Sequence, residues 1–203
     1  MRIRPYQPGD LDDLYHICLR TADDGRDATP LFRDPRLPGH IYAGPYAAFE
    51  PSLAFVAEDS GGVGGYTLGA LDTRAFEQRL ERDWWPTLRV SHPEPDPDED
   101  VSQPERYAIR HIHHPWTAAR DLADRFPSHL HIDLLPRLQG HGIGRQLIAT
   151  LTAALRKQNS PGVHLFVGRG NQNAPGFYRH LGFTELPAGD ALIFTMDLAG
   201  RPG

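Results

Sequence analysis

The sequence predicts a mixed α/β fold, in which a central sheet is covered on both sides by helices. Segments that alternate or run apolar, as strands do, are interleaved with segments whose apolar residues recur at helical spacing. The pattern is firmest in the last third of the chain. There the order is strand, helix, strand, helix, strand, strand between residues 129 and 197. This order is typical of a sheet packed between helices.

Composition indicates a soluble protein with a single domain. The chain has 203 residues, 39% of them hydrophobic, and a formal net charge of −5. That length supports one sizeable core, which we expect to span 1–200. The apolar runs fall far short of the roughly 20 residues of a membrane span, and the N-terminus has no signal-peptide pattern. We therefore expect a cytoplasmic protein without a membrane or nucleic-acid partner, since a negative chain neutralises phosphates poorly.

The first half of the chain predicts three strands, a helix and a long loop. They are, in order, a strand over 2–6, a helix starting at 8–10, a loop over 22–44 with one or two helical turns, and paired strands over 53–58 and 63–71. In the helix, Leu11, Leu14 and Cys18 share one face. We therefore interpret Cys18, the only cysteine, as a core residue rather than a reactive thiol. A single cysteine excludes an internal disulfide and a cysteine-based zinc site.

Residues 73–128 predict an irregular insertion with helices over 73–84, 107–114 and 117–126. The acidic, proline-rich stretch 92–105 predicts an exposed loop, with an acidic substrate rim as the alternative. His111, His113 and His114 form a cluster without familiar metal spacing. We therefore expect no metal, and interpret the cluster as a surface or pocket-lining group that could include a general base.

The last third predicts the remaining elements. They are a strand over 129–135, a long helix over 140–159, a strand over 163–167, a short helix over 174–181, and a hairpin of strands over 183–186 and 191–197. The stretch from Gln139 to Arg145 follows the first strand, opens the long helix and contains three glycines. The first N–H groups of a helix lack partners, and glycines let a pyrophosphate approach them. The stretch therefore predicts an anion site, unless it is only a glycine-rich turn.

Two other phosphate-binding motifs fit this stretch poorly. A P-loop would end in Gly-Lys-Ser/Thr, which is missing here. A dinucleotide fingerprint would have a third glycine where Arg145 stands.

Two motifs in this region resemble those of the GNAT acetyltransferases. Gln139-x-x-Gly142-x-Gly144 after a strand is similar to the acyl-CoA pyrophosphate loop of that family. The second motif is similar to the family's later signature and reads Asn171-x-x-Ala174-x-x-Phe177-Tyr178-x-x-x-Gly182-Phe183. Arg4 and Asp10 resemble the family's first segment.

The resemblance implies a mostly antiparallel sheet with a V-shaped splay, and acetyl-CoA as cofactor. The pantetheine arm would thread the gap between strands 129–135 and 163–167, along the backbone of Leu134 and Leu135. The pyrophosphate would bind Gln139, Gly140, His141, Gly142, Ile143, Gly144 and Arg145. The rest of the implied cofactor site is Asn171, Asn173, Phe177 and Tyr178.

Acyl transfer from a thioester to an amine needs a neutral amine, a donor for the oxyanion and a proton for the thiolate. A splayed strand offers a free backbone N–H as the oxyanion donor, which we assign to Leu134 or its neighbour. Tyr178 is the candidate acid for the thiolate, unless it only packs on the cofactor. Asp133 is the candidate base, directly or through water, unless strand alternation turns it to the other side.

The first half also resembles the acetyltransferase-like domain at the C-terminus of O-GlcNAcase. The segments that carry this resemblance are 18–27, 44–46, 55–59, 65–72, 84–86 and 126–128, together with Asp133. The animal domain departs from the cofactor loop and is regarded as a pseudo-acetyltransferase, whereas this chain retains Gln139, Gly142 and Gly144. The resemblance therefore implies a free-standing bacterial relative that can bind acetyl-CoA.

The same resemblance suggests an acceptor side opposite the cofactor. Its candidate residues are Asp23, Asp24, Asp27, Tyr42, Tyr46 and Trp84. Carboxylates there would suit a cationic amine, although Asp24 and Asp27 could instead cap a loop or helix.

The sequence is compatible with two functions. The first is an N-acetyltransferase that uses acetyl-CoA and acts by direct attack within a ternary complex, on a small-molecule amine or a protein lysine. The second is a non-catalytic module that binds acetyl-CoA or another protein. Exposed strand edges are compatible with a homodimer.

Overall fold

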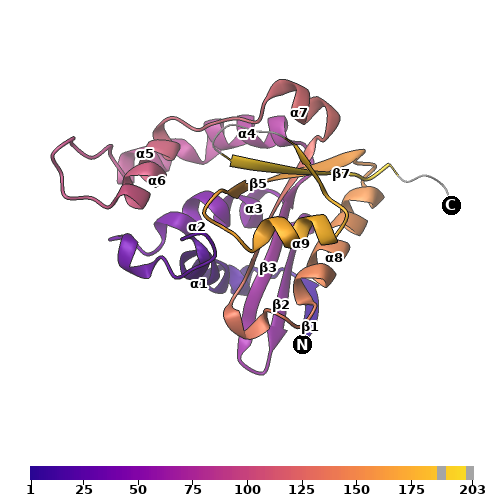
Figure 1. Cartoon of the computed structure of the whole chain (residues 1–203). Coiled ribbons are helices and arrows are strands. Elements are labelled where there is room, and N and C mark those ends of the chain that lie inside the picture. Colours follow the sequence, from indigo (N-terminus) through magenta and orange to yellow (C-terminus); the bar gives the residue numbers. More distant parts are fainter. Residues whose placement is uncertain (187–190, 200–203) are drawn as a thin grey trace.

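The computed structural model describes residues 1–186 and 191–199, and a seven-stranded sheet lies at its centre (Figure 1). The strand order is β1-β2-β3-β4-β5-β7-β6. The strands are β1 (Arg2–Pro5), β2 (Ala54–Asp59), β3 (Gly62–Ala70), β4 (Ser128–Leu134), β5 (Gly162–Gly168), β6 (Thr184–Leu186) and β7 (Ala191–Asp197). Among the described strands, only the neighbours β4 and β5 are parallel. The predicted mixed, mostly antiparallel sheet is therefore confirmed.

Nine α-helices surround the sheet in the part of the chain that the structure describes. They are α1 (Leu11–Thr21), α2 (Leu37–Tyr42), α3 (Gly44–Phe49), α4 (Thr73–Asp83), α5 (Trp85–Ser91), α6 (Gln103–His113), α7 (Arg120–Arg125), α8 (Ile143–Lys157) and α9 (Ala174–His180). The sequence did not predict α3 and α5, because six or seven residues are too few to establish a helical period. Each has a proline in its first turn, where the missing N–H costs nothing.

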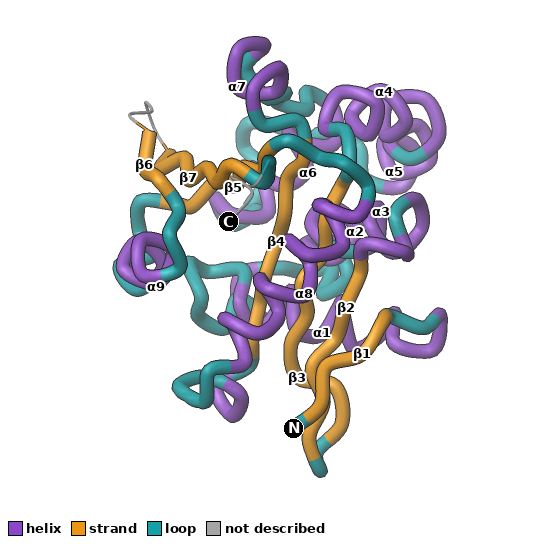
Figure 2. The backbone as a smooth tube through the Cα atoms, turned by 90° about the vertical axis from the view of Figure 1, so that its right-hand side faces the viewer, coloured by secondary structure: helices purple, strands orange, loops and turns teal. Residues whose placement is uncertain are grey.

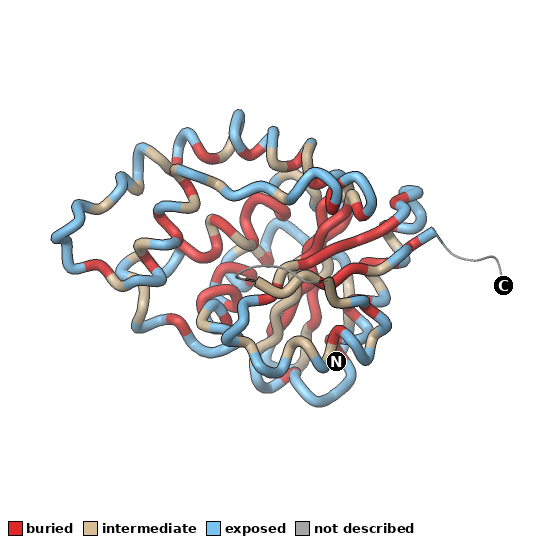
Figure 3. Tube along the Cα trace, turned by 45° about the horizontal axis from the view of Figure 1, so that its top comes forward, coloured by how far each residue is buried: buried red, intermediate tan, exposed pale blue. Residues whose placement is uncertain are grey.

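The helices form a layer on each face of the sheet. On one face, Leu147, Leu151 and Leu155 of α8 are fully buried. On the other face, Leu14 and Ile17 of α1 pack in a second cluster that includes residues of β2 and β3. Buried residues follow the central strands, and exposed residues follow the outer turns (Figure 3). No helix among the described residues is long and apolar enough to cross a membrane.

Two strands in the middle of the sheet separate. β4 and β5 are paired only at Ser128 with Val163 and at His129 with His164. From there β4 follows β3, while β5 follows β7, and Figure 2 shows β5, β7 and β6 turning away from the first four strands. The hydroxyl groups of Ser128 and Ser160 meet at 2.7 Å at the closed end. The implied V-shaped splay is therefore confirmed.

The segment 73–128 folds into α4, α5, α6 and α7, which lie beside α2, α3 and the closed end of the V (Figure 1). The predicted helix over 117–126 is shorter than expected, since α7 covers only Arg120–Arg125. The N–H and hydroxyl of Thr73 both donate to the carbonyl of Pro127, at 2.8 and 2.7 Å. The two ends of the segment are therefore joined where β4 begins.

Candidate active site

The loop between β4 and α8 is held in one conformation by two side chains. Gln139 Nε2 donates to the carbonyl of Leu134 at 2.8 Å. Arg137 Nη2 donates to the carbonyls of Gly62 and Val63, at 3.1 and 3.0 Å. The loop is therefore tied both to the end of its own strand and to the β2–β3 hairpin.

Glycines allow this loop to enter α8 with its N–H groups free. Gly140 and Gly142 have φ values of +76° and +75°, a conformation that residues with a Cβ avoid. These values explain why α8 begins at Ile143 rather than at the predicted 140. No side chain of the described residues caps this end, so its first N–H groups are open to a ligand. His141 and Arg145 are exposed beside them, and the arrangement fits a diphosphate.

Gly144 and Phe177 show how α8 and α9 come together at this loop. A Cβ on Gly144 would lie 3.0 Å from Phe177 Cζ and 3.2 Å from Leu134 Cδ1. A larger residue would therefore push apart the helix, the strand and α9. Asn173 is the exposed N-cap residue of α9.

The edge of β4 that faces the V carries free N–H groups. Leu135 N–H donates to the carbonyl of Gly64 at 2.8 Å, and its own carbonyl accepts from Leu138. Backbone groups alternate along an antiparallel pair, so the N–H groups of Ile132 and Leu134 point away from β3. The N–H groups available for the pantetheine arm are therefore those of Ile132 and Leu134, and the expected pairing at Leu135 is corrected.

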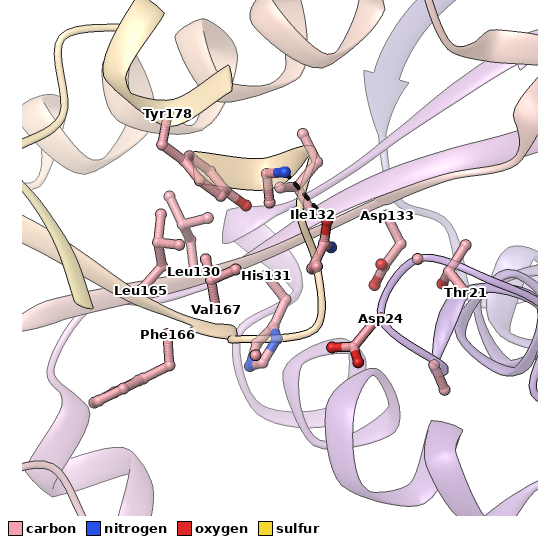
Figure 4. Close-up of a pocket in the computed structure, with 15 residues that line it drawn as sticks. Thr21, Asp24, Leu130, His131, Ile132, Asp133, Leu165, Phe166, Val167 and Tyr178 are labelled. Carbon is pink, nitrogen blue, oxygen red and sulfur yellow. Dashed lines mark hydrogen bonds between the residues drawn. The ribbon is translucent and has the colours of Figure 1, made fainter. Parts of the chain in front are cut away.

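A small cavity of about 190 Å³ occupies the V between β4, β5, α9 and the turn after α1 (Figure 4). Tyr178 enters it from α9 with only 7% of its surface exposed. Asn171 also lines it, and its Oδ1 accepts a hydrogen bond from Ala174 N–H at 3.1 Å. Tyr178 and Asn171 therefore both line the α9 side of the V.

Asp133 lies where this cavity meets a second one. It lines both cavities, so its side chain faces the α1 side of the sheet. The hydroxyl of Tyr66 donates to Asp133 Oδ2 at 2.6 Å. Burial raises the pKa of Asp133 to about 6, although that hydrogen bond favours the carboxylate. Figure 4 shows Asp24 and Asp133 directed into the same space.

The second cavity is a chamber of about 860 Å³ on the side of α1, α2, α4 and α6. It shares Asp24, His131 and Asp133 with the small cavity, so the two cavities adjoin at these residues. His129, His131 and Asp133 are alternate residues of β4, which explains why all three face this chamber.

Histidines line the chamber in their neutral form. Burial lowers the pKa of His131 and of His111 to about 4. Burial also lowers the pKa of His129 and His164. The interior of the chamber therefore disfavours positive charge at neutral pH.

The hydrogen bonds of His129 define its tautomer. The Thr73 hydroxyl donates its only proton to Pro127, so it accepts from His129 Nδ1 at 2.8 Å. His129 Nε2 then accepts from the Tyr46 hydroxyl at 2.7 Å. This chain of hydrogen bonds fixes the Tyr46 side chain in the wall of the chamber.

Two other imidazoles have a free nitrogen. His164 Nδ1 donates to the carbonyl of Phe126 at 2.7 Å, which leaves Nε2 as a hydrogen-bond acceptor. His164 Nε2 and His111 Nδ1 are buried and have no partner among the described residues. Buried polar atoms are almost always paired, so these two indicate a ligand or ordered water.

Only some of the residues that were predicted to bind the acceptor lie together in the structure. Asp24, Tyr42 and Tyr46 line the chamber. Asp23, Asp27 and Trp84 line neither cavity. Their side chains are engaged elsewhere: Asp23 with Arg26 at 3.0 Å, Asp27 with the Thr29 hydroxyl at 2.6 Å, and Trp84 Nε1 with the carbonyl of His40 at 2.8 Å. The capping alternative therefore describes Asp27, and the indole that lines the chamber is Trp85.

The histidine cluster is also divided. His111 lines the chamber, whereas His113 Nε2 meets the carbonyl of His92 and His114 Nε2 meets Glu94.

The sequence did not indicate several residues of the site, which are His131, Tyr66, His164, Glu77, Trp85 and Trp116. The alternation of 129–133 could have placed His131 beside Asp133. The other residues come from separate segments, and no local pattern links them.

Comparison with known proteins assigns the chain to a family. The family model described as "Acetyltransferase (GNAT) domain" matches residues 112–185. The crystal structure of SsHAT is 37% identical to this chain, covers 98% of each chain and superposes with a TM-score of 0.90. The chain belongs to the GNAT acetyltransferase family, whose members are acyltransferases.

More distant relatives agree with this family. Protein O-GlcNAcase from Rattus norvegicus and from Mus musculus is 27% identical over 199 residues, which are 98% of this chain. This chain spans only 22% of the length of those relatives. The structure of yncA from Salmonella typhimurium with its cofactor acetyl-CoA is 16% identical, covers 100% of this chain and 96% of its own, and has a TM-score of 0.55. It supports the fold.

Proposed function

We propose that this protein transfers the acetyl group of acetyl-CoA to a primary amine, by direct attack within a ternary complex. The observation that carries the proposal is that two cavities adjoin at Asp133. The small cavity lies in the V between β4, β5 and α9, and the chamber lies on the side of α1, α2, α4 and α6. Two substrates can therefore meet beside Asp133, one in each cavity.

The residues around the V fit acetyl-CoA. The N–H groups at the start of α8, from Gly142 onward, are free to bind the diphosphate, with Arg145 adding positive charge. The N–H group of Leu134 is free to pair with the pantetheine arm. Asn171, Asn173 and Phe177 border the same side. When bound, acetyl-CoA supplies a thioester whose carbonyl carbon accepts the amine.

Three groups of the chain perform the proton and charge steps. Asp133, with a pKa of about 6, is mostly ionised at neutral pH and accepts the proton of the incoming ammonium. The N–H of Ile132, on the open edge beside Asp133, stabilises negative charge on the carbonyl oxygen. Burial raises the pKa of Tyr178, so its hydroxyl keeps the proton that the departing thiolate needs.

A non-catalytic module that holds acetyl-CoA is the alternative function. Such a module would need the start of α8 to bind the diphosphate of acetyl-CoA. It would not need a carboxylate of raised pKa placed between two cavities. Asp133 therefore favours the enzyme over the module.

Calorimetry with acetyl-CoA and a CoA-release assay with a panel of primary amines test the proposal together. We expect saturable binding of acetyl-CoA and amine-dependent release of CoA. Binding without release for any amine would support the module, and no saturation at millimolar acetyl-CoA would refute both functions.

A further inference from the structure

We propose that the acceptor is a small primary amine with an aromatic ring that carries a hydrogen-bond donor, bound in the 860 Å³ chamber. This inference rests on the proposed acetyl transfer. The chamber is of the size that binds small molecules, roughly 300–1,000 Å³. Its lining comes from α1 to α6, β4, β5 and β7, so a ligand inside is surrounded by many elements.

The walls of the chamber are aromatic. They contain the side chains of Phe32, Tyr42, Tyr46, Phe76, Trp85, Tyr107, Trp116 and Phe166. The ring of Trp116 meets Phe166 edge-on at 4.9 Å, and Tyr42 stacks with His111 at 6.5 Å. Such walls offer both faces and edges to another ring, the two arrangements that aromatic pairs prefer.

The charge distribution suits a ligand with one cationic end. The carboxylates of Asp24 and Asp133 lie at the junction of the two cavities, where the amine must meet the acyl group. No lysine or arginine lines the described part of the chamber. Beyond the junction, the neutral histidines mark an interior in which a second ammonium group would be buried at high cost. Glu77 is the one carboxyl group that lines the described chamber beyond the junction, and burial raises its pKa, so it is a weak partner for a second ammonium and a polyamine is disfavoured.

The end of the chamber away from Asp133 has two hydrogen-bond acceptors that are not fully paired among the described residues. His164 Nε2 is an acceptor with no partner among the described residues. Glu77 of α4 also lines the chamber; the N–H of Ala118 donates to its Oε1 at 2.9 Å, and burial raises the pKa of this carboxyl. A hydroxyl or N–H on the ring of the ligand would satisfy these groups, whereas the side chain of a protein lysine carries no such donor.

The two ends of the site lie at different positions along the strands. His164 pairs in register with His129, which precedes Asp133 by four residues of β4. At about 3.3 Å per residue, these backbone positions are roughly 13 Å apart. The amine and the ring donor of the ligand therefore belong at opposite ends of the molecule, as in a phenylethylamine with a para-hydroxyl group.

The test compares tyramine with 2-phenylethylamine, spermidine and a capped lysine peptide in the CoA-release assay. We expect kcat/KM for tyramine to exceed the value for spermidine and for the peptide by about tenfold or more. We also expect tyramine to exceed 2-phenylethylamine, because the latter leaves His164 Nε2 unpaired. A higher kcat/KM for spermidine or the peptide overturns the inference, and equal values for the two aromatic amines overturn the assigned ring donor.

A binding measurement separates this inference from the proposed activity. Trp85 and Trp116 line the chamber, so tyramine should quench tryptophan fluorescence saturably even without acetyl-CoA. Quenching without any CoA release would refute the activity and support the inference. CoA release from other amines, with no quenching by tyramine, would refute the inference and support the activity.

A variant locates the bound ring. Trp116 is 46% exposed, so its replacement by alanine should leave the fold intact. Trp116→Ala should raise KM for tyramine severalfold while the affinity for acetyl-CoA stays unchanged. The matched control is Val90→Ala, at a residue of α5 that is 84% exposed and lies outside the chamber lining. An unchanged KM in Trp116→Ala, or the same rise in both variants, would count against an aromatic acceptor in this chamber.

Discussion

At the scale of single residues, Asp133 has the surroundings of a general base. Burial and the Tyr66 hydroxyl act on it in opposite directions, and burial is the larger effect. The resulting pKa of about 6 lies close enough to neutral pH for the carboxylate to be ionised and still take up a proton. Asp10 shows the contrast, since hydrogen bonds from Arg4 lower its pKa and make it a poor base.

The first prediction concerns the pH profile. If Asp133 must be ionised, kcat/KM should fall as pH drops through about 6 in the free enzyme. Asp133→Asn removes the base and should lower kcat/KM by about 100-fold or more. The variant should also lose the inflection near pH 6. A wild-type profile that is flat through this range would assign the base to another group, of which His131 is the nearest candidate.

The second prediction concerns Tyr178. Tyr178→Phe keeps the ring that packs against Phe183 and Phe194 but removes the proton donor. We expect kcat to fall by about 100-fold or more, while calorimetry gives an unchanged affinity for acetyl-CoA. Unchanged turnover would mean that Tyr178 only packs against the cofactor.

At the scale of elements, the conformation of the loop before α8 controls the anion site. Gly142 has a φ of +75°, and no atom of the described residues lies within 4 Å of the position of a Cβ. Gly142→Ala would therefore cause no clash, but the left-handed conformation costs about 1–2 kcal/mol. We expect a lower affinity for acetyl-CoA, since relaxation of the loop moves its N–H groups.

Gly182→Ala is the matched control for that third prediction. Gly182 follows α9, has a φ of +87° and is equally free of neighbours, so its substitution imposes a similar strain away from the loop. Both variants should lower the melting temperature similarly, but calorimetry should detect weaker acetyl-CoA binding only in Gly142→Ala. Equal affinities in the two variants would contradict the proposed diphosphate site.

The elements also show which features a sequence can predict. The β4–loop–α8 unit was predictable because its strand, glycines and helix are adjacent in the chain, and a short local pattern determines them. Tyr66 was not assigned to the site because its role depends on pairing in register with Asp133, 67 residues away. Trp84 and Trp85 could not be separated, since their roles depend on the phase of a helix too short to show a period.

The chamber could not be predicted for the same physical reason. His131, His164 and Trp116 come from a central strand, its splayed neighbour and the loop before α7. Only the closing of the sheet and the packing of α4 to α7 bring them together. Asp23, Asp24 and Asp27 illustrate the converse, because three carboxylates close in sequence point in different directions once the turn after α1 forms.

At the scale of the whole molecule, the buried chamber makes stability depend on pH. The fourth prediction is that the free energy of unfolding falls as pH drops from about 6.5 toward 4. His111 and His131 have folded pKa values of about 4, so below their unfolded value of 6.5 the unfolded chain binds protons that the folded chain cannot. At pH 5 this effect amounts to at most about 2 kcal/mol for each histidine.

Protonation of Asp133 changes the free energy of unfolding in the opposite direction to the histidines. The size of each contribution therefore decides whether stability rises or falls. Its pKa is raised from 3.8 to about 6, so the folded chain gains stability as Asp133 takes up its proton. Between neutral pH and pH 5 this gain is about 1 kcal/mol, which is less than the combined loss from the two histidines. His129 and His164, whose pKa values are also lowered, add to the loss.

Urea unfolding at pH 7 and pH 5 measures how much the free energy of unfolding falls between the two pH values. The same measurement on His131→Asn shows how much of the fall comes from one histidine. The variant removes one protonation site from the unfolded chain, so its loss of stability between the two pH values should be smaller than that of the wild type. Asn keeps a polar side chain in the chamber. The variant's free energy of unfolding at pH 7 should therefore differ from the wild-type value by less than the two proteins differ in their loss of stability between pH 7 and pH 5. A wild-type protein that is equally stable at both pH values would mean that water enters the chamber and solvates its imidazoles, which would also weaken the case for an apolar acceptor.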